Sequence, residues 1–245
     1  MLKSTAPHGR IHPVMLCILA VIVLLGGVCF YWLLTFPDVA ALKTANPPST
    51  ALMDARERQA RSDDKPFRRR WTWVPLGQIA PALQRAVIAA EDAQFFLHEG
   101  FDWEGLKDAA VKNIEAGKVT HGGSTITQQL AKNLYLSSER SFLRKAQEAL
   151  ITRALEHHLS KRRILEIYLN VAEWGHGVFG AEAAARHHFH KSTADLTEEE
   201  ASLLAAILPA PRRYDPLRLT PHVLARQRTI LRNMDKVVTH AAHPR

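Results

Sequence analysis

Cysteine is scarce in this chain of 245 residues, with only Cys17 and Cys29 present, both inside one apolar stretch. Two cysteines cannot build a disulfide framework or a zinc site with four cysteine ligands. The G-x-x-x-x-G-K-[ST] spacing of a nucleotide-binding loop is also absent, which argues against nucleotide hydrolysis. No alternating apolar and polar run is long enough to force a large β-sheet. A disulfide-rich, nucleotide-hydrolysing or sheet-dominated protein is therefore disfavoured.

The composition is that of a chain that folds around a core. Apolar residues make up 47% and charged residues 23% of the sequence, which excludes wholesale disorder. Lysine and arginine number 32 against 24 acidic residues, a net charge of +8. This excess favours anionic partners such as phosphates, nucleic acid or acidic lipid, and the sign of the charge does not choose among them.

An uncharged apolar run extends from Val14 to Phe36, and about 20 such residues suffice for a helix to cross a bilayer. The run predicts a single transmembrane helix after a cytoplasmic tail at residues 1–13. Lys3 and Arg10 precede the run and the first charge after it is Asp38, so the rest of the chain is expected outside the cytoplasmic membrane. A cleaved signal peptide is the alternative, although its apolar core normally has about 7 to 15 residues.

Residues 37–70 contain Pro47-Pro48, mixed charges and the run Arg68 to Arg70, without a sustained apolar period. They predict a stalk near the membrane, whose arginines either contact anionic lipid headgroups or form an ordinary solvated run. Residues 71–245 are enough for one sizeable domain and too few for two typical ones. Because this domain is expected outside the cytoplasm, nucleic-acid binding is disfavoured.

The domain is predicted to be mainly α-helical. Apolar residues recur at helical spacing, and capping signals mark where helices begin or end. Thr125 with Gln128, and Thr197 with Glu200, form capping boxes, each a reciprocal pair of hydrogen bonds at a helix start. Helices are expected to end at Glu91-Asp92, to run from Asp102 to about Gly117, to open at Thr125, Ser141 and Ser160, to run from Thr197 to Pro209, and to follow Thr220.

Two groups of residues could carry chemistry. Glu91 and Asp92 close an apolar helix, and burial there would raise the pKa of a carboxylate toward that of a general base; a cap or a salt bridge is the alternative role. The stretch GGSTITQQ at residues 122–129 opens a helix whose free N–H groups could bind phosphate. Several cations follow it closely in the sequence and could together hold a diphosphate. Alternatively, Arg144 and Glu148, four residues apart on one helical face, form an ordinary surface ion pair. The basic residues are Lys132, Arg140, Arg144 and Lys145.

Thirteen histidines are present, and the run His187, His188, His190 invites a metal-site interpretation. Adjacent histidines on a helix point about 100° apart, so this spacing does not present a typical chelating face. The sequence therefore assigns no residue to a metal site, and the role of this stretch stays open.

Four linked motifs resemble a known family. EDAQFFLHEGFD, GGSTITQQLAKNL, RSFLRKAQEA and KRRILEIYLN, in this order, are similar to the successive motifs of the peptidoglycan glycosyltransferases, glycosyltransferase family 51. The similarity extends from about Trp71 to Pro216. It implies a mainly helical, lysozyme-like fold of two lobes. With no transpeptidase domain expected after it, the chain is similar to the monofunctional members. HHFH, at residues 187–190, departs from the tyrosine-containing text usual at that place.

The resemblance also implies a reaction and its residues. The 4-hydroxyl of a lipid II sugar displaces the lipid diphosphate of the growing glycan, inverting the anomeric centre and forming a β-1,4 link. Glu91 matches the catalytic base, and Glu148 the second glutamate, which organises the diphosphate or a bound metal. The remaining matched positions bind the diphosphate or line the cleft, with Asp92 in support: Asp92, Ser124, Thr125, Gln128, Lys132, Arg140, Arg144 and Lys145.

No cofactor is required by the sequence, although Mg²⁺ or another divalent cation could assist at the diphosphate. The expected partners are lipid II, the growing glycan-lipid diphosphate, the membrane and other cell-wall synthesis proteins. Two other functions stay open: a glycan-cleaving hydrolase, since lysozyme-like clefts also use carboxylates, and a catalytically silent scaffold. The basic cluster disfavours the first, and the pair Glu91 and Glu148 disfavours the second.

Overall fold

The computed structural model describes residues 13–115, 117, 123–137, 139 and 141–237, and divides the chain into two compact units, residues 1–38 and 39–245. In the first unit, the predicted apolar segment forms one helix, α1 (Pro13–Thr35), which carries no charged side chain. Within the described residues, no helix reaches the length and hydropathy that a membrane span requires. The transmembrane helix thus stays a prediction.

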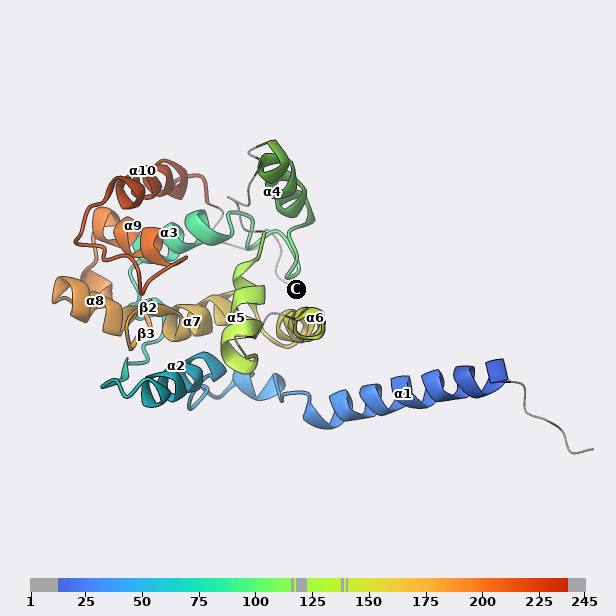
Figure 1. Cartoon of the computed structure of the whole chain (residues 1–245). Coiled ribbons are helices and arrows are strands. Elements are labelled where there is room, and N and C mark those ends of the chain that lie inside the picture. Colours follow the sequence, from blue (N-terminus) through green and yellow to red (C-terminus); the bar gives the residue numbers. More distant parts are fainter. Residues whose placement is uncertain (1–12, 116, 118–122, 138, 140, 238–245) are drawn as a thin grey trace, which may run out of the picture. The chain divides into compact units, whose positions relative to one another are not determined.

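The second unit is mainly helical, as predicted. Its principal elements are helices and one small sheet (Figure 1). In chain order they are α2 (Ala51–Ser62), β1 (Arg70–Trp71), α3 (Pro81–Glu91), α4 (Trp103–Glu115), α5 (Ile126–Tyr135), α6 (Phe142–His158), α7 (Lys161–Val171), β2 (Glu173–Gly175), β3 (Val178–Phe179), α8 (Ala181–Phe189), α9 (Glu198–Ile207) and α10 (Pro221–Met234), with short 3₁₀ turns at Ala40–Lys43, Leu76–Gln78 and Thr193–Asp195.

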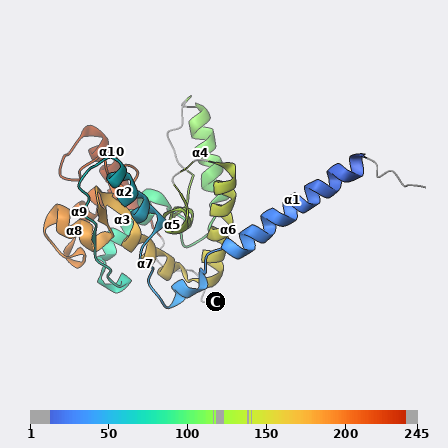
Figure 2. The same ribbon diagram turned by 60° about the horizontal axis from the view of Figure 1, so that its bottom comes forward.

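Helices α3, α9 and α10 pack against one another, while α5 packs against α2, α6 and α7 (Figures 1 and 2). The strands form a sheet in the order β1-β3-β2, with β1 parallel and β2 antiparallel to β3. Fully buried Phe95, Tyr168, Trp174 and Phe179 are the largest side chains of the core. The lysozyme-like division into two lobes stays a prediction.

The helix boundaries follow the capping signals of the sequence. The side-chain hydroxyls of Thr125 and Thr197 each accept a hydrogen bond from the backbone N–H three residues later. The side chain of that later residue accepts a hydrogen bond from the backbone N–H of the threonine. Ser141, Ser160 and Thr220 cap α6, α7 and α10 in the same way, without the return bond. Local hydrogen bonding therefore decides where these helices begin.

The boundary predicted at Trp71 differs from the structure. The second unit already begins at Val39, and Val39, Leu42, Met53 and Ala60 are buried in its core. The stretch predicted as a stalk thus contains helix α2, which packs against α5. Its sequence concealed this because α2 carries many charged residues and buries only a narrow apolar side.

Candidate active site

Glu91 is the last residue of α3, and its side chain is 11% exposed. Its Oε2 accepts a hydrogen bond of 2.9 Å from Nε2 of Gln129 on α5. Its Oε1 is buried and accepts no hydrogen bond, while the guanidinium of Arg226 on α10 lies 3.5 Å away. Three helices therefore converge on one carboxylate, whose Oε1 accepts no hydrogen bond but lies within ion-pair distance of Arg226.

Burial raises the pKa of Glu91 above that of an ordinary carboxyl group, because removing solvent disfavours the charged form. The hydrogen bond from Gln129 and the charges of Arg226 and Lys132 act in the opposite direction. Tyr168 extends the network, since its hydroxyl donates to Oε1 of Gln129 over 2.9 Å. The result is a carboxyl group of increased proton affinity held in a fixed orientation.

Asp92 faces the protein interior, and its carboxylate binds the start of α5. Its Oδ2 accepts the backbone N–H of Ile126 over 2.9 Å, and its Oδ1 contacts Nε2 of His98 at 2.8 Å. This arrangement connects the C-terminal end of α3 to the N-terminal end of α5 and so fixes Glu91 relative to Gln129. The role predicted for Asp92 among the substrate-binding residues stays a prediction.

A second cluster surrounds Glu148 on α6, a carboxylate whose residue is 3% exposed. Nη1 of Arg144 donates to its Oε2 over 2.8 Å, and Nζ of Lys145 donates to its Oε1. Lys132 on α5 belongs to the same electrostatic neighbourhood: loss of solvent lowers its pKa, Glu148 and Glu91 raise it, and Arg144 and Lys145 lower it. Arg140, also predicted here, lies outside the described residues.

A cavity of about 370 Å³ is lined by residues from both clusters, although neither Glu91 nor Glu148 is among its lining residues. Gln129, the partner of Glu91, lines it together with Lys132 and Arg144. Tyr168 also lines it, so the acid network and the cations border the same space. The remaining lining residues are Leu52, Ala55, Arg56, Asn133, Leu136, Ser137, Ala172, Glu173, Leu208, Pro209 and Pro211.

The polar residues at the start of α5 divide into two kinds. Ser124 is exposed, whereas Thr125 and Gln128 are buried and close the capping box. Thr125 also donates its hydroxyl to the carbonyl of Gly100 over 2.8 Å. Thus the neighbour of Gln128, Gln129, is the glutamine that reaches the cavity.

Sequence reasoning missed Gln129, Tyr168 and Arg226 as parts of the site. The signal for Gln129 was available: a side chain that closes a capping box is occupied, and the next residue points about 100° away around the helix. For Arg226 no local signal exists, because its proximity to Glu91 depends on the packing of α10 against α3.

This helical unit has a buried carboxylate beside a cavity lined by cations. Such a site suits an enzyme that transfers a group away from an anionic leaving group. Residues 58–235 match the transglycosylase family, and the chain belongs to this family. The predicted resemblance is thereby confirmed, and the protein is a glycosyl-transferring enzyme.

Related proteins cover most of the chain. A biosynthetic peptidoglycan transglycosylase of Laribacter hongkongensis is 48% identical over 214 residues, 87% of this chain and 94% of the relative. Proteins of the same name from Nitrosospira multiformis and an Azoarcus species are 49% and 53% identical, over 83% and 75% of this chain and 88% and 79% of their own lengths. The similarity therefore extends over 79% to 94% of the length of these relatives.

Proposed function

We propose that this protein is a peptidoglycan glycosyltransferase that polymerises lipid II into glycan strands and releases the lipid diphosphate. The observation that carries the proposal is the position of Glu91: a buried carboxylate with a free oxygen, bonded to a residue that lines the cation-bordered cavity. Family membership and the names of the relatives support the same substrate class.

In this proposal Glu91 is the general base. It takes the proton from the 4-hydroxyl of the acceptor sugar as that oxygen attacks the anomeric carbon of the donor. Its raised pKa suits the task, because a base is most effective when its pKa is near the working pH. Gln129 holds the carboxylate through Oε2 and leaves Oε1 for the hydroxyl.

The cations of the Glu148 cluster stabilise the leaving diphosphate. Negative charge builds on the bridging oxygen as the bond to the anomeric carbon breaks, and positive groups already in position stabilise that charge without reorganising. Arg144 and Lys132 line the cavity, and Glu148 fixes Arg144 and Lys145 through direct ion pairs. Glu148 thus positions these two cations. Ser124 is the exposed polar residue nearest in sequence to the start of α5.

A divalent cation fits the observed donors poorly. Both oxygens of Glu148 already accept from Arg144 and Lys145, so an ion bound there would have to displace one of them. Among the residues that the structure describes, no three histidine, cysteine, aspartate or glutamate side chains form a metal-binding group.

The proposal includes attachment to the cytoplasmic membrane, with the catalytic unit on its outer side. The uncharged run from Val14 to Phe36 and the basic residues before it support this topology. A lipid-linked substrate gives the reason, because an anchored enzyme and its substrate then share one surface.

Polymerisation of labelled lipid II by the purified chain tests the proposal. Glu91→Gln should reduce the rate by about 10²- to 10⁴-fold, the usual contribution of a general base. Glu99→Gln is the matched control, since that carboxylate is 57% exposed on the same motif. Full activity of Glu91→Gln would show that Glu91 is not the base. Release of fragments from purified glycan strands would indicate that the protein cleaves glycan instead.

A further inference from the structure

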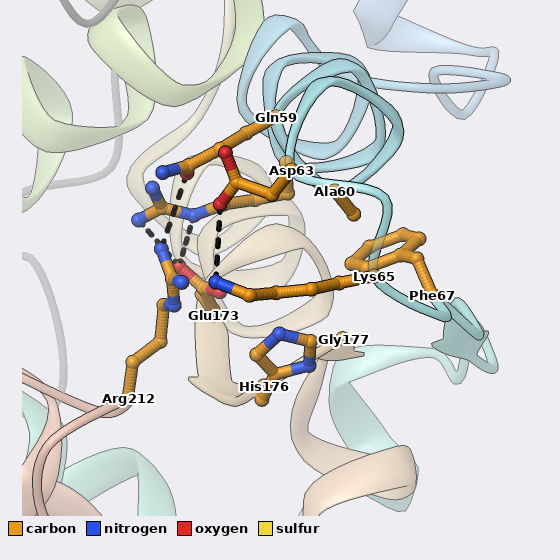
Figure 3. A pocket seen from close by; sticks show the side chains of 10 residues that line it. Gln59, Ala60, Asp63, Lys65, Phe67, Glu173, His176, Gly177 and Arg212 are labelled. Atoms are coloured by element: carbon orange, nitrogen blue, oxygen red, sulfur yellow. Dashed lines mark hydrogen bonds and ion pairs between the residues drawn. The ribbon is translucent and has the colours of Figure 1, made fainter.

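A second, smaller cavity has a volume of about 240 Å³, and Figure 3 shows the residues that line it. The two cavities share Arg56 and Glu173, and otherwise have different walls. The smaller one is lined by Arg56, Gln59, Ala60, Asp63, Lys65, Phe67, Glu173, His176, Gly177 and Arg212. Its volume is slightly below the roughly 300 Å³ at which ligand pockets commonly begin, which suits a ligand the size of one amino acid.

Glu173 provides the observation that points to a ligand. It opens strand β2, and its side chain is 5% exposed. Its Oε2 accepts from both Nε and Nη2 of Arg56 at 2.8 Å, whereas its Oε1 is buried without a hydrogen-bond partner. A buried carboxylate oxygen without a donor is costly. The pocket therefore favours a ligand that brings a hydrogen-bond donor, best of all a cationic one.

The opposite charge is supplied across the same pocket. The guanidinium of Arg212 points toward Gln59 and Glu173 (Figure 3), and its hydrogen bond to Oε1 of Gln59 is long, at 3.4 Å. The ammonium of Lys65 lies 3.3 Å from Asp63, and both of these side chains are exposed. Arg212 and Lys65 are thus loosely held cations, able to turn toward an anionic group of a ligand.

The apolar part of the wall limits the rest of the ligand. Ala60 and Phe67 contribute carbon surface, and the ring of His176 meets the ring of Phe67 edge-on with 5.9 Å between centroids. Gly177 adopts φ +71°, and a Cβ there would approach the carbonyl oxygen of Arg68 to 2.6 Å. A side chain at this position would therefore clash with the backbone, so only glycine fits in this part of the wall.

We propose that this pocket binds an amino-acid zwitterion, either free or as the free amino-acid end of a side chain within a peptide. The ligand's ammonium donates to Oε1 of Glu173, and its carboxylate accepts from Arg212 and Lys65. A simple anion would leave Oε1 of Glu173 unpartnered, and a simple cation would leave Arg212, which contacts only the amide of Gln59, without an anionic partner. A ligand with both groups satisfies both sides.

Titration calorimetry on the full chain tests the pocket with three probes of similar length. meso-Diaminopimelate carries an ammonium and a carboxylate at each end, pimelate lacks the ammonium groups, and cadaverine lacks the carboxylates. Diaminopimelate should bind at least tenfold more tightly than either of the other two. No heat with diaminopimelate, or equal binding of pimelate, would overturn the proposal.

Variants locate the binding. Arg212→Ala should weaken binding of diaminopimelate at least fivefold, and Glu173→Gln should do the same through the ammonium. Arg213→Ala is the control, because this neighbouring arginine is exposed and lies over the ring of Tyr214 instead of lining the pocket. Equal affinities of the Arg212→Ala and Arg213→Ala variants would place the ligand elsewhere.

A kinetic comparison distinguishes the two sources of the zwitterion, and only this comparison rests on the proposed function. With lipid II that carries its peptide, Arg212→Ala should raise KM if the substrate's peptide occupies the pocket, and a peptide-free lipid-linked disaccharide should show no such change. An unchanged KM with both substrates, together with calorimetric binding of diaminopimelate, would assign the pocket to a free amino acid. If the protein did not polymerise lipid II at all, the calorimetric test of the pocket would still hold, because it does not depend on that activity.

Discussion

Arg226, on the last helix that the structure describes, places its guanidinium 3.5 Å from Oε1 of Glu91, the oxygen of the proposed base that accepts no hydrogen bond. The same side chain donates through Nε to the carbonyl of Ala206 at the end of α9, over 3.1 Å. Helix α10 thereby brings a positive charge to a carboxylate more than a hundred residues earlier in the chain. The charge counteracts the effect of burial on the pKa of Glu91.

Replacing Arg226 by glutamine should move the acid limb of the pH profile of kcat/KM to higher pH. Arg226 lowers the pKa of Glu91, so its removal raises that pKa, and the base is protonated over a wider range. Arg226→Lys retains the charge and should keep the limb near its original position. Arg228→Gln, an exposed residue of the same helix, should leave the profile unchanged. An unchanged profile for Arg226→Gln would show that Arg226 does not tune the base.

Arg144→Ala should reduce the polymerisation rate by about 10²-fold, the usual loss when one group that stabilises transition-state charge is removed. The variant should also lose about 1–3 kcal/mol in the free energy of unfolding, because buried Glu148 loses its 2.8 Å partner. Arg153→Ala on the same helix, 67% exposed, is the control. Lipid II kinetics and urea unfolding measure the two effects. Equal polymerisation rates for both variants would show that Arg144 does not stabilise the leaving diphosphate.

Thr125→Ala should destabilise the protein by about 2 kcal/mol, since it removes an N-cap and the bond to the carbonyl of Gly100. The corresponding fall in Tm is about 4–8 °C. Ser124→Ala, next to it and exposed, should change stability by less than about 0.5 kcal/mol. Thermal unfolding of the two variants checks this difference. Equal Tm values would mean that the capping box contributes little.

Glu91→Gln should become more stable than the original protein as pH rises. The folded state raises the pKa of Glu91 above its usual value of 4.5. Between pH 4.5 and the pKa of the folded state, the folded protein therefore binds more protons than the unfolded chain. The free energy of unfolding of the original protein falls as pH rises through that window, whereas the glutamine of the variant does not titrate. Below the window the difference should stop changing. Unfolding at a series of pH values measures it, and a pH-independent difference would contradict the raised pKa.

The helices were predictable because their signals are local. A threonine followed three residues later by glutamine or glutamate closes its own hydrogen bonds, so Thr125 and Thr197 mark helix starts in any tertiary setting. Proline and glycine act equally locally, and α9 ends at Ile207 just before Pro209. Glu91 became a candidate for a similar reason, as the acidic end of an apolar helix, whereas its role as a base came from the resemblance to the family and stays a proposal.

Residues 39–70 show where the sequence was insufficient. Met53 and Ala60 are buried on a helix whose other positions are largely polar, and the exposed charges of that helix obscured its short apolar side. Which face of α2 is covered depends on its packing against α5, and that contact joins segments far apart in the chain.

By itself the sequence determined the family, the helical class and the residue types of the site, because motif spacing and helix caps are properties of neighbouring residues. Tertiary structure alone decided that Gln129 holds Glu91, that Arg226 lies beside it and that Glu173 keeps one oxygen free between two cavities. Each of these relationships joins side chains from different helices or strands. Long-range packing sets their distances, and no local pattern encodes them.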